Sequence, residues 1–112
     1  MKKYMKRLII LQKLIEDTKC KVRLKPDRTN QITDWRGGFG IPVEGYIEVA
    51  GPERIADVEW IELDPIVVTH IGRLVPPHIA FVSDAIREVL NKELVEFDVV
   101  KGMIRIDGSQ LR

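Results

Sequence analysis

The chain has 112 residues, of which 45% are hydrophobic and 31% are charged. This length suits one domain, and the composition is unlike that of disordered chains, which combine low hydrophobicity with high net charge. The 18 Lys and Arg residues nearly balance the 17 Asp and Glu residues, so no strong overall field would gather nucleic acid or anionic membrane around the protein. We therefore expect a single domain over residues 1–112, with nucleic acid an unlikely partner.

The first 18 residues predict an amphipathic helix, because apolar residues recur on one side at helical spacing. These are Tyr4, Leu8, Leu11 and Ile15. The same projection places Ile9 and Ile10 among the charged residues, where the core of the domain is not expected to reach. Exposed apolar residues of this kind predict a contact surface, here a homodimer through Ile9 and Ile10.

Neither secretion nor membrane insertion is indicated. A single cysteine, Cys20, cannot form an intramolecular disulfide. The apolar run Leu8 to Leu11 is far shorter than the roughly 20 residues that a membrane-spanning helix needs. We expect a cytoplasmic protein that does not bind membranes.

Several strands are expected after the helix. Apolar and basic residues alternate over Lys19–Lys25, and apolar and acidic residues alternate over Val43–Val49, so that these two strands could lie side by side. Val58–Leu63 and Ile66–Ile71 predict two further strands separated by an Asp64-Pro65 turn. A short strand is possible at Gln31–Arg36, inside a long polar loop.

The C-terminal part predicts a second helix and a hairpin. Pro76 and Pro77 suit the first turn of a helix that runs to about Asn91. Leu94–Val100 and Met103–Asp107 then predict a β-hairpin, joined across Lys101-Gly102. The expected order is one helix, five strands, a second helix and two strands, which favours an α+β fold with a mostly antiparallel sheet and both helices packed on one face.

No cofactor or metal site is predicted. The glycines of 37–40 lead toward Pro42 and a strand without a following Lys-Ser or Lys-Thr pair, so they do not form a phosphate-binding loop. His70 and His78 have no recognised ligand spacing. The carboxylates on the expected strands are better explained as partners of Lys21 and Arg23 in cross-strand charge pairs. They are Glu44, Glu48, Glu59, Glu62 and Asp64.

Two alternative functions stay open. A small hydrolase or nuclease would use Asp34, Glu59, His70 and His78, and Arg73 could join His78 in a catalytic pair. A nucleic-acid accessory protein would use the basic residues of the first helix. They are Lys2, Lys3, Lys6, Arg7 and Lys13.

The two tryptophans favour a different function. Trp35 and Trp60 both lie beside charged residues, and tryptophan, tyrosine and arginine are common anchors of protein interfaces. Trp35, Arg36, Tyr46 and Trp60 therefore predict a binding patch, centred on the polar loop 27–42. On this basis we expect a non-catalytic protein-interaction domain.

Three segments resemble a group of small uncharacterised bacterial proteins. They are Asp34-Trp35-Arg36-Gly37, Asp57-Val58-Glu59-Trp60-Ile61 and Gly72-Arg73-Leu74-Val75-Pro76. The resemblance implies a bacterial source and an independently folded small domain, and it carries no activity, cofactor or catalytic residue. Small α/β domains of this size are often antitoxin or immunity proteins, by analogy of size and fold alone. With no catalytic motif and an aromatic patch, the leading hypothesis is a protein that neutralises a toxin or regulates another protein.

Overall fold

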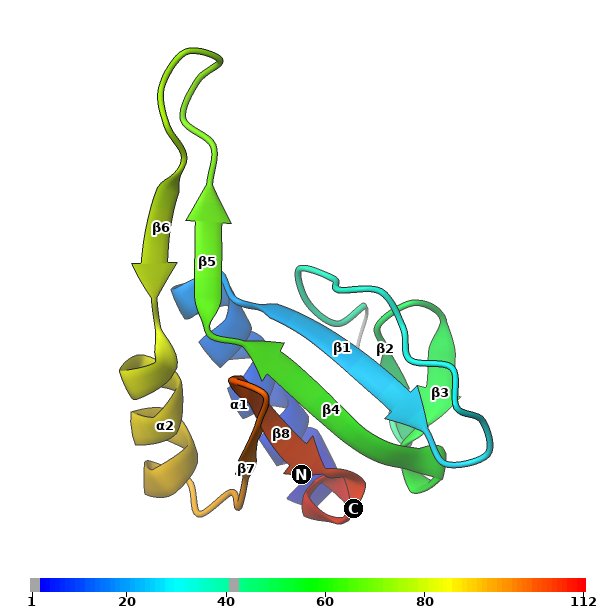
Figure 1. The fold of residues 1–112 in the computed structure, drawn as a ribbon. Helices are drawn as coiled ribbons and strands as arrows, with labels where there is room; N and C mark the ends of the chain where they lie inside the picture. Colours follow the sequence, from blue (N-terminus) through cyan, green and yellow to red (C-terminus); the bar gives the residue numbers. More distant parts are fainter. Residues whose placement is uncertain (1–2, 41–42) are drawn as a thin grey trace.

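A computed structural model describes residues 3–40 and 43–112 of the chain (Figure 1). It confirms the α+β class and the order of helix, strands, helix and strands. The elements are α1 (Lys3–Thr18), β1 (Lys21–Pro26), β2 (Tyr46–Glu48), β3 (Pro52–Arg54), β4 (Val58–Asp64), β5 (Ile66–Thr69), β6 (His78–Phe81), α2 (Ser83–Lys92), β7 (Asp98–Val100) and β8 (Met103–Asp107), with short 3₁₀ turns at Ile55–Asp57 and Gly108–Leu111. Neither helix, over its described residues, has the length and apolar character needed to cross a membrane.

The strands form one four-stranded sheet and two separate two-stranded ribbons. The sheet has the order β1-β4-β8-β7, and the ribbons are β2–β3 and β5–β6. Every pair of strands is antiparallel. The β2–β3 ribbon flanks the sheet, whereas the β5–β6 ribbon projects beyond the rest of the molecule (Figure 1).

The core lies between one face of the sheet and both helices. Strand residues alternate between the two faces, and the inward positions of neighbouring strands pair in register, with Leu24 opposite Ile61 and Ile61 opposite Ile106. Helix α1 contributes Leu11 and Ile15 to this core, and α2 contributes its own apolar stripe. The two helices therefore cover the same face, and the other face is left without a helix.

The β7–β8 hairpin turns where the sequence predicts. Lys101 and Gly102 have φ angles of +52° and +83°, the two positive values that a two-residue type I′ turn requires. Just after β8, Gly108 is buried against β4. A side chain there would collide with the backbone carbonyl of Val58, so only glycine permits this close approach.

The predicted start of the second helix is wrong. Pro76 and Pro77 do not begin α2 but lie in the connection between β5 and β6. Residues His78–Phe81 form a strand because they pair along β5, with Val68 opposite Ile79, and α2 starts only at Ser83. Proline fits a turn as well as a first helical turn, and here the pairing strand decides between the two.

The predicted neighbours of the basic strand also differ. The acidic strand of 43–49 shrinks to β2, which pairs with the short β3, while β1 lies beside β4. Segment Gln31–Arg36 forms no strand and makes one isolated bridge, between Arg36 and Val22. The acidic partners of the basic strand therefore come from β4, where Glu62 binds Arg23 and Glu59 binds Lys25.

Candidate interaction site

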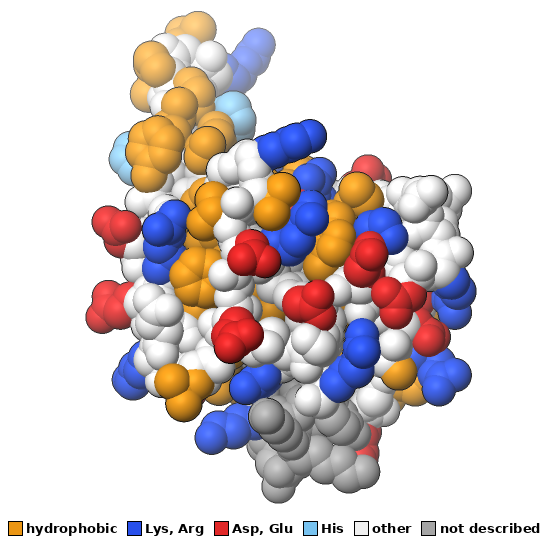
Figure 2. Space-filling view, turned by 60° about the horizontal axis from the view of Figure 1, so that its bottom comes forward, with side chains coloured by type: hydrophobic (Ala, Val, Ile, Leu, Met, Phe, Trp, Pro, Cys, Tyr) orange, Lys and Arg blue, Asp and Glu red, His pale blue; other side chains and the backbone are white. Residues whose placement is uncertain are grey.

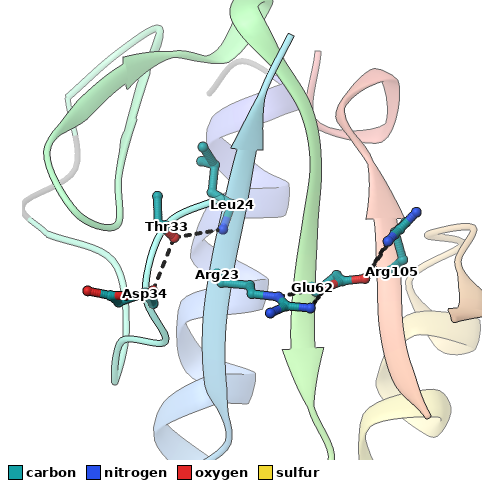
Figure 3. Close-up of polar contacts among 6 residues, drawn as sticks. All are labelled: Arg23, Leu24, Thr33, Asp34, Glu62 and Arg105. Carbon is teal, nitrogen blue, oxygen red and sulfur yellow. Dashed lines mark hydrogen bonds and ion pairs between the residues drawn. The ribbon is translucent and has the colours of Figure 1, made fainter. Parts of the chain in front are cut away.

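The uncovered face of the sheet carries a buried carboxylate between two arginines (Figure 3). Glu62, at the centre of β4, lies opposite Arg23 of β1 and Arg105 of β8. Arg23 donates to Oε1 through Nε and Nη2 at 2.8 and 2.7 Å, and Arg105 donates to Oε2 at 2.9 and 2.8 Å. The Glu62 side chain is 1% exposed, so each oxygen is held by two charge-assisted hydrogen bonds in a place that excludes water.

Each of the two arginines also contacts a tryptophan. The Cζ of Arg23 lies 4.4 Å from the ring centroid of Trp35, and that of Arg105 lies 4.3 Å from the ring centroid of Trp60. These are cation–π contacts, in which the ring face attracts the guanidinium. The five side chains form one connected series of contacts on this face, with Trp60 two residues before Glu62 on β4, and we call the series the tryptophan–arginine row. They are Trp35, Arg23, Glu62, Arg105 and Trp60.

The loop before β2 brings Trp35 to this row. Arg36 exchanges two backbone hydrogen bonds with Val22, both 2.8 Å, and the amide of Thr33 donates to the carbonyl of Leu24 at 2.9 Å. The Thr33 hydroxyl accepts the amide hydrogen of Leu24 in return, at 3.0 Å (Figure 3). The loop thus runs along the free edge of β1, and Trp35 falls on the same side of the sheet as Arg23.

The four predicted binding residues occupy different environments. Trp60 is 7% exposed and Trp35 is half-buried, and both belong to the tryptophan–arginine row. Arg36 is exposed on the loop, and Tyr46 is exposed on the β2–β3 ribbon, outside the row. Trp60 therefore presents little surface to a partner.

The predicted contact on the first helix lines a groove. Ile9 of α1 and Tyr46 of β2 face a groove of about 400 Å³, which Phe39 and Ile47 also line. Ile9 is exposed, while Ile10 is half-buried. Ile9 and Tyr46, which the sequence assigns to two different contact surfaces, therefore line the same groove.

The candidate residues of the hydrolase alternative are scattered. His70 and His78 are exposed on the β5–β6 ribbon, as is Arg73. Glu59 forms an ion pair with Lys25 on the body of the domain, and Asp34 lies in the loop beside β1. Over residues 3–40 and 43–112, no three His, Cys, Asp or Glu side chains come together in a group that could hold a metal ion.

The basic residues of α1 are partly engaged within the domain. Arg7 donates to the carbonyl of Gln110, and Lys13 forms an ion pair with Asp17 at 3.7 Å. Lys6 is exposed. Lys2 lies outside the described residues, and so does the side chain of Lys3.

The β5–β6 ribbon, with the turn 70–77 between its strands, forms a projecting arm. We call residues 66–81 the arm. Hydrophobic side chains and both histidines gather over it in the space-filling view (Figure 2). No residue from 66 to 81 is buried.

The root of the arm is held by few bonds. The amide of Val82 donates to the carbonyl of Pro65 at 2.8 Å, which closes the base of the ribbon. The amide of Ile66 donates to the Asp64 carboxylate at 3.0 Å. On the side of the ribbon that Val67 occupies, the root packs against the core, and the opposite side faces outward.

The outward side of the arm is apolar. Ile66 lies opposite Phe81, and Val68 lies opposite Ile79, so that four large side chains share one face of the ribbon. We call these four residues the outer face of the arm. Phe81 is 77% exposed, and Leu74 in the turn is 98% exposed. This concentration of exposed apolar side chains is the main feature that the fold itself leaves uncovered.

A family described as a family of unknown function (DUF6678) matches residues 12–110. The chain belongs to this family. The match confirms the resemblance to uncharacterised proteins, and its range contains both the tryptophan–arginine row and the arm. No match was found among curated proteins or among solved structures.

Sequence reasoning missed the arm as a site. Its apolar residues were assigned to a strand and to the stripe of a helix, two positions that would bury them. A signal was present, because Arg73 is the only Lys, Arg, Asp or Glu from residue 65 to residue 82. A stretch of that length with one charge and a proline pair at its middle is compatible with a hairpin whose partner lies elsewhere.

Proposed function

We propose that this chain is a non-catalytic protein-interaction domain and that the arm is its binding surface. The observation that carries the proposal is the exposure of the outer face, above all of Phe81. Neutralisation of a toxin, as in immunity and antitoxin proteins, and regulation of another protein are the roles we propose for such a domain.

The energetics of the arm support a bound partner. A two-stranded hairpin is marginally stable in water at best, and burying a large apolar side chain contributes about 1.5 to 3 kcal/mol. Because the outer face is uncovered, the isolated domain gains little of that contribution. Large exposed apolar patches on soluble proteins commonly mark interaction sites.

The charges of the arm favour a protein over nucleic acid. Binding to a phosphate backbone depends on several Lys or Arg side chains, and the arm supplies only Arg73. The tryptophan–arginine row offers no free cation either, because Arg23 and Arg105 are both bound to Glu62.

The backbone of the arm favours a protein over a lipid core. In the described structure β5 pairs with β6 alone, so each strand has one edge without a neighbouring strand. Unpaired backbone groups are costly in hydrocarbon, whereas water or a protein partner can satisfy them. Co-sedimentation with neutral and with anionic lipid vesicles checks this point, and binding to either would contradict it.

Photo-crosslinking in cells tests the proposed function. A benzophenone amino acid replaces Phe81, and in a matched control it replaces Leu94, which is 80% exposed on the body of the domain. We expect the Phe81 variant to form a covalent adduct with protein and the Leu94 variant to form much less. Equal adducts at the two positions, or none at Phe81, would contradict the proposal.

A further inference from the structure

We infer that the partner of the arm is a second copy of this chain, and that two outer faces pack against each other about a two-fold axis. This inference rests on the proposed function and names the partner of that site. The contact would be isologous, since the outer face and the turn of each chain meet the same residues of the other.

The outer face suits a copy of itself. Its two cross-strand pairs, Ile66 with Phe81 and Val68 with Ile79, contain no polar side chain. Two copies of such a patch can pack together without burying an unpaired charged or hydrogen-bonding side chain. Burying such groups is a major cost of forming an interface. Two ribbons packed face to face lie about 10 Å apart, the usual distance between sheets.

The outer face and the turn together have close to the area of a stable interface. The arm exposes seven large apolar side chains. They are Ile66, Val68, Ile71, Leu74, Val75, Ile79 and Phe81. At roughly 100 Å² each, the four side chains of the outer face offer about 400 Å², and the three in the turn bring the total to about 700 Å², close to the roughly 800 Å² that one partner typically contributes to a stable complex.

The electrostatics do not oppose the association. The whole chain has a formal net charge of +1, so two copies repel each other only weakly. Arg73 lies in the turn, away from the paired positions of the outer face, and can keep its guanidinium in water.

The first helix offers a weaker alternative surface for a dimer. Ile9 is exposed there, but Ile10 is half-buried, and both sit beside charged side chains. The arm exposes seven large apolar side chains, whereas Ile9 is the one that α1 exposes among its described side chains. A homodimer through Ile9 and Ile10 is therefore the competing outcome of the experiment.

Sedimentation of the full chain over about 1 µM to 1 mM tests the inference. We expect a species of twice 12.9 kDa. Because loss of an interface anchor costs at least about 2 kcal/mol, Phe81→Glu should weaken the dimer by at least about 30-fold. Leu94→Glu, which also replaces an exposed apolar residue, should leave the dimer unchanged. Circular dichroism of each variant confirms that it is folded.

Spin labels locate the interface independently of stability. The native Cys20 does not compete for label, because it is 1% exposed and burial raises the pKa of its thiol. A label on Ile79→Cys should show strong dipolar coupling to its copy across the two-fold axis. A label on Leu94→Cys should not, since α2 spans about 15 Å from the arm root.

Each contrary result separates this inference from the proposed function. A monomer at 1 mM overturns the inference, and the proposed function still stands if Phe81 crosslinks to another protein. A dimer that survives Phe81→Glu but is lost in Ile9→Lys also overturns the inference, and assigns the contact to α1. A monomer whose Phe81 crosslinks to nothing overturns both.

Discussion

The guanidinium of Arg23 lies over the indole ring of Trp35, and the same guanidinium binds the carboxylate of Glu62. Trp60 makes the same kind of contact with Arg105, the second arginine that binds Glu62. The two rings differ in burial, because Trp60 is almost fully enclosed and Trp35 is half-buried. Comparing substitutions of the two tryptophans can therefore separate a structural role from a binding role.

Trp60→Ala should lower the free energy of unfolding by about 3 to 5 kcal/mol, the usual cost of removing a buried aromatic side chain. Trp35→Ala should cost about 1 to 2 kcal/mol, from a smaller buried area and a lost cation–π contact. Urea midpoints measure both, and Tyr46→Ala, on an exposed position, serves as the control. Equal losses for the two tryptophans would contradict this assignment.

If Trp35 also contacts a partner, Trp35→Ala should weaken that binding by at least about 2 kcal/mol.

Glu62→Gln should lower the free energy of unfolding by about 2 kcal/mol or more, because it leaves two arginines facing a neutral amide at a buried position. The side chains of Arg23 and Arg105 are about one third exposed and can turn toward water, which keeps the loss below that of a fully buried pair. Glu59→Gln is the matched control on the same strand, since Glu59 forms an ion pair with Lys25 but is 45% exposed. Its loss should stay under about 1 kcal/mol. The same loss for both variants, measured by denaturant unfolding, would show that burial of Glu62 has no energetic role.

Asp107 should contribute to the acid sensitivity of the fold. The backbone amide of Ser109 donates to the Asp107 carboxylate at 2.8 Å, and this hydrogen bond lowers the pKa of Asp107. Since the pKa is lower in the folded chain than in the unfolded chain, the stabilisation is present above the unfolded value and is lost as the pH falls through the folded value.

Asp107→Asn keeps an oxygen that can accept the amide but removes this titration. We expect the variant to lose less stability than the parent between neutral and acidic pH, by under about 1 kcal/mol because the carboxylate is exposed. Thermal melts at a series of pH values measure the difference. Parallel pH profiles for the two proteins would rule out this role of Asp107.

Backbone amides in the arm should exchange with solvent far faster than those of β4. The arm amides are protected only by the pairing of β5 with β6, whereas β4 has a neighbouring strand on both sides. Hydrogen exchange of Phe81→Glu, which we expect to be monomeric, gives the comparison free of any contact between copies. In the parent chain, the protection of the arm should rise with protein concentration. Protection of the arm equal to that of β4 in the variant would contradict the description of the arm as an uncovered hairpin.

Local patterns in the sequence predict the main sheet well. The alternation around Val22 and Leu24 places β1, and the Lys101-Gly102 pair fixes the β7–β8 turn, because both signals depend on residues close together in the chain. Cross-strand pairing of Arg23 with a carboxylate was also expected, and Glu62 is the residue that the structure supplies.

The wrong parts of the prediction depend on distant partners. Pro76 and Pro77 are compatible with a helix start or with a turn, and only the pairing of His78–Phe81 with β5 decides between them. The sequence left the burial of Trp60 open, and its contact with Arg105, 45 residues further along the chain, is not revealed by periodicity in β4 alone. The sequence does not reveal the exposure of the outer face either, because an apolar strand is normally assigned to a core.

The arm is a direct continuation of β4, which lies between β1 and β8 in the sheet. Force applied along the arm would pass through Asp64 and Pro65 into that strand and load its hydrogen bonds to both neighbours together. Shearing a strand that is bonded on both edges requires many of those bonds to break at once. At its other end the arm leads through β6 into α2, so a load on the arm is shared between the central strand of the sheet and a helix of the core.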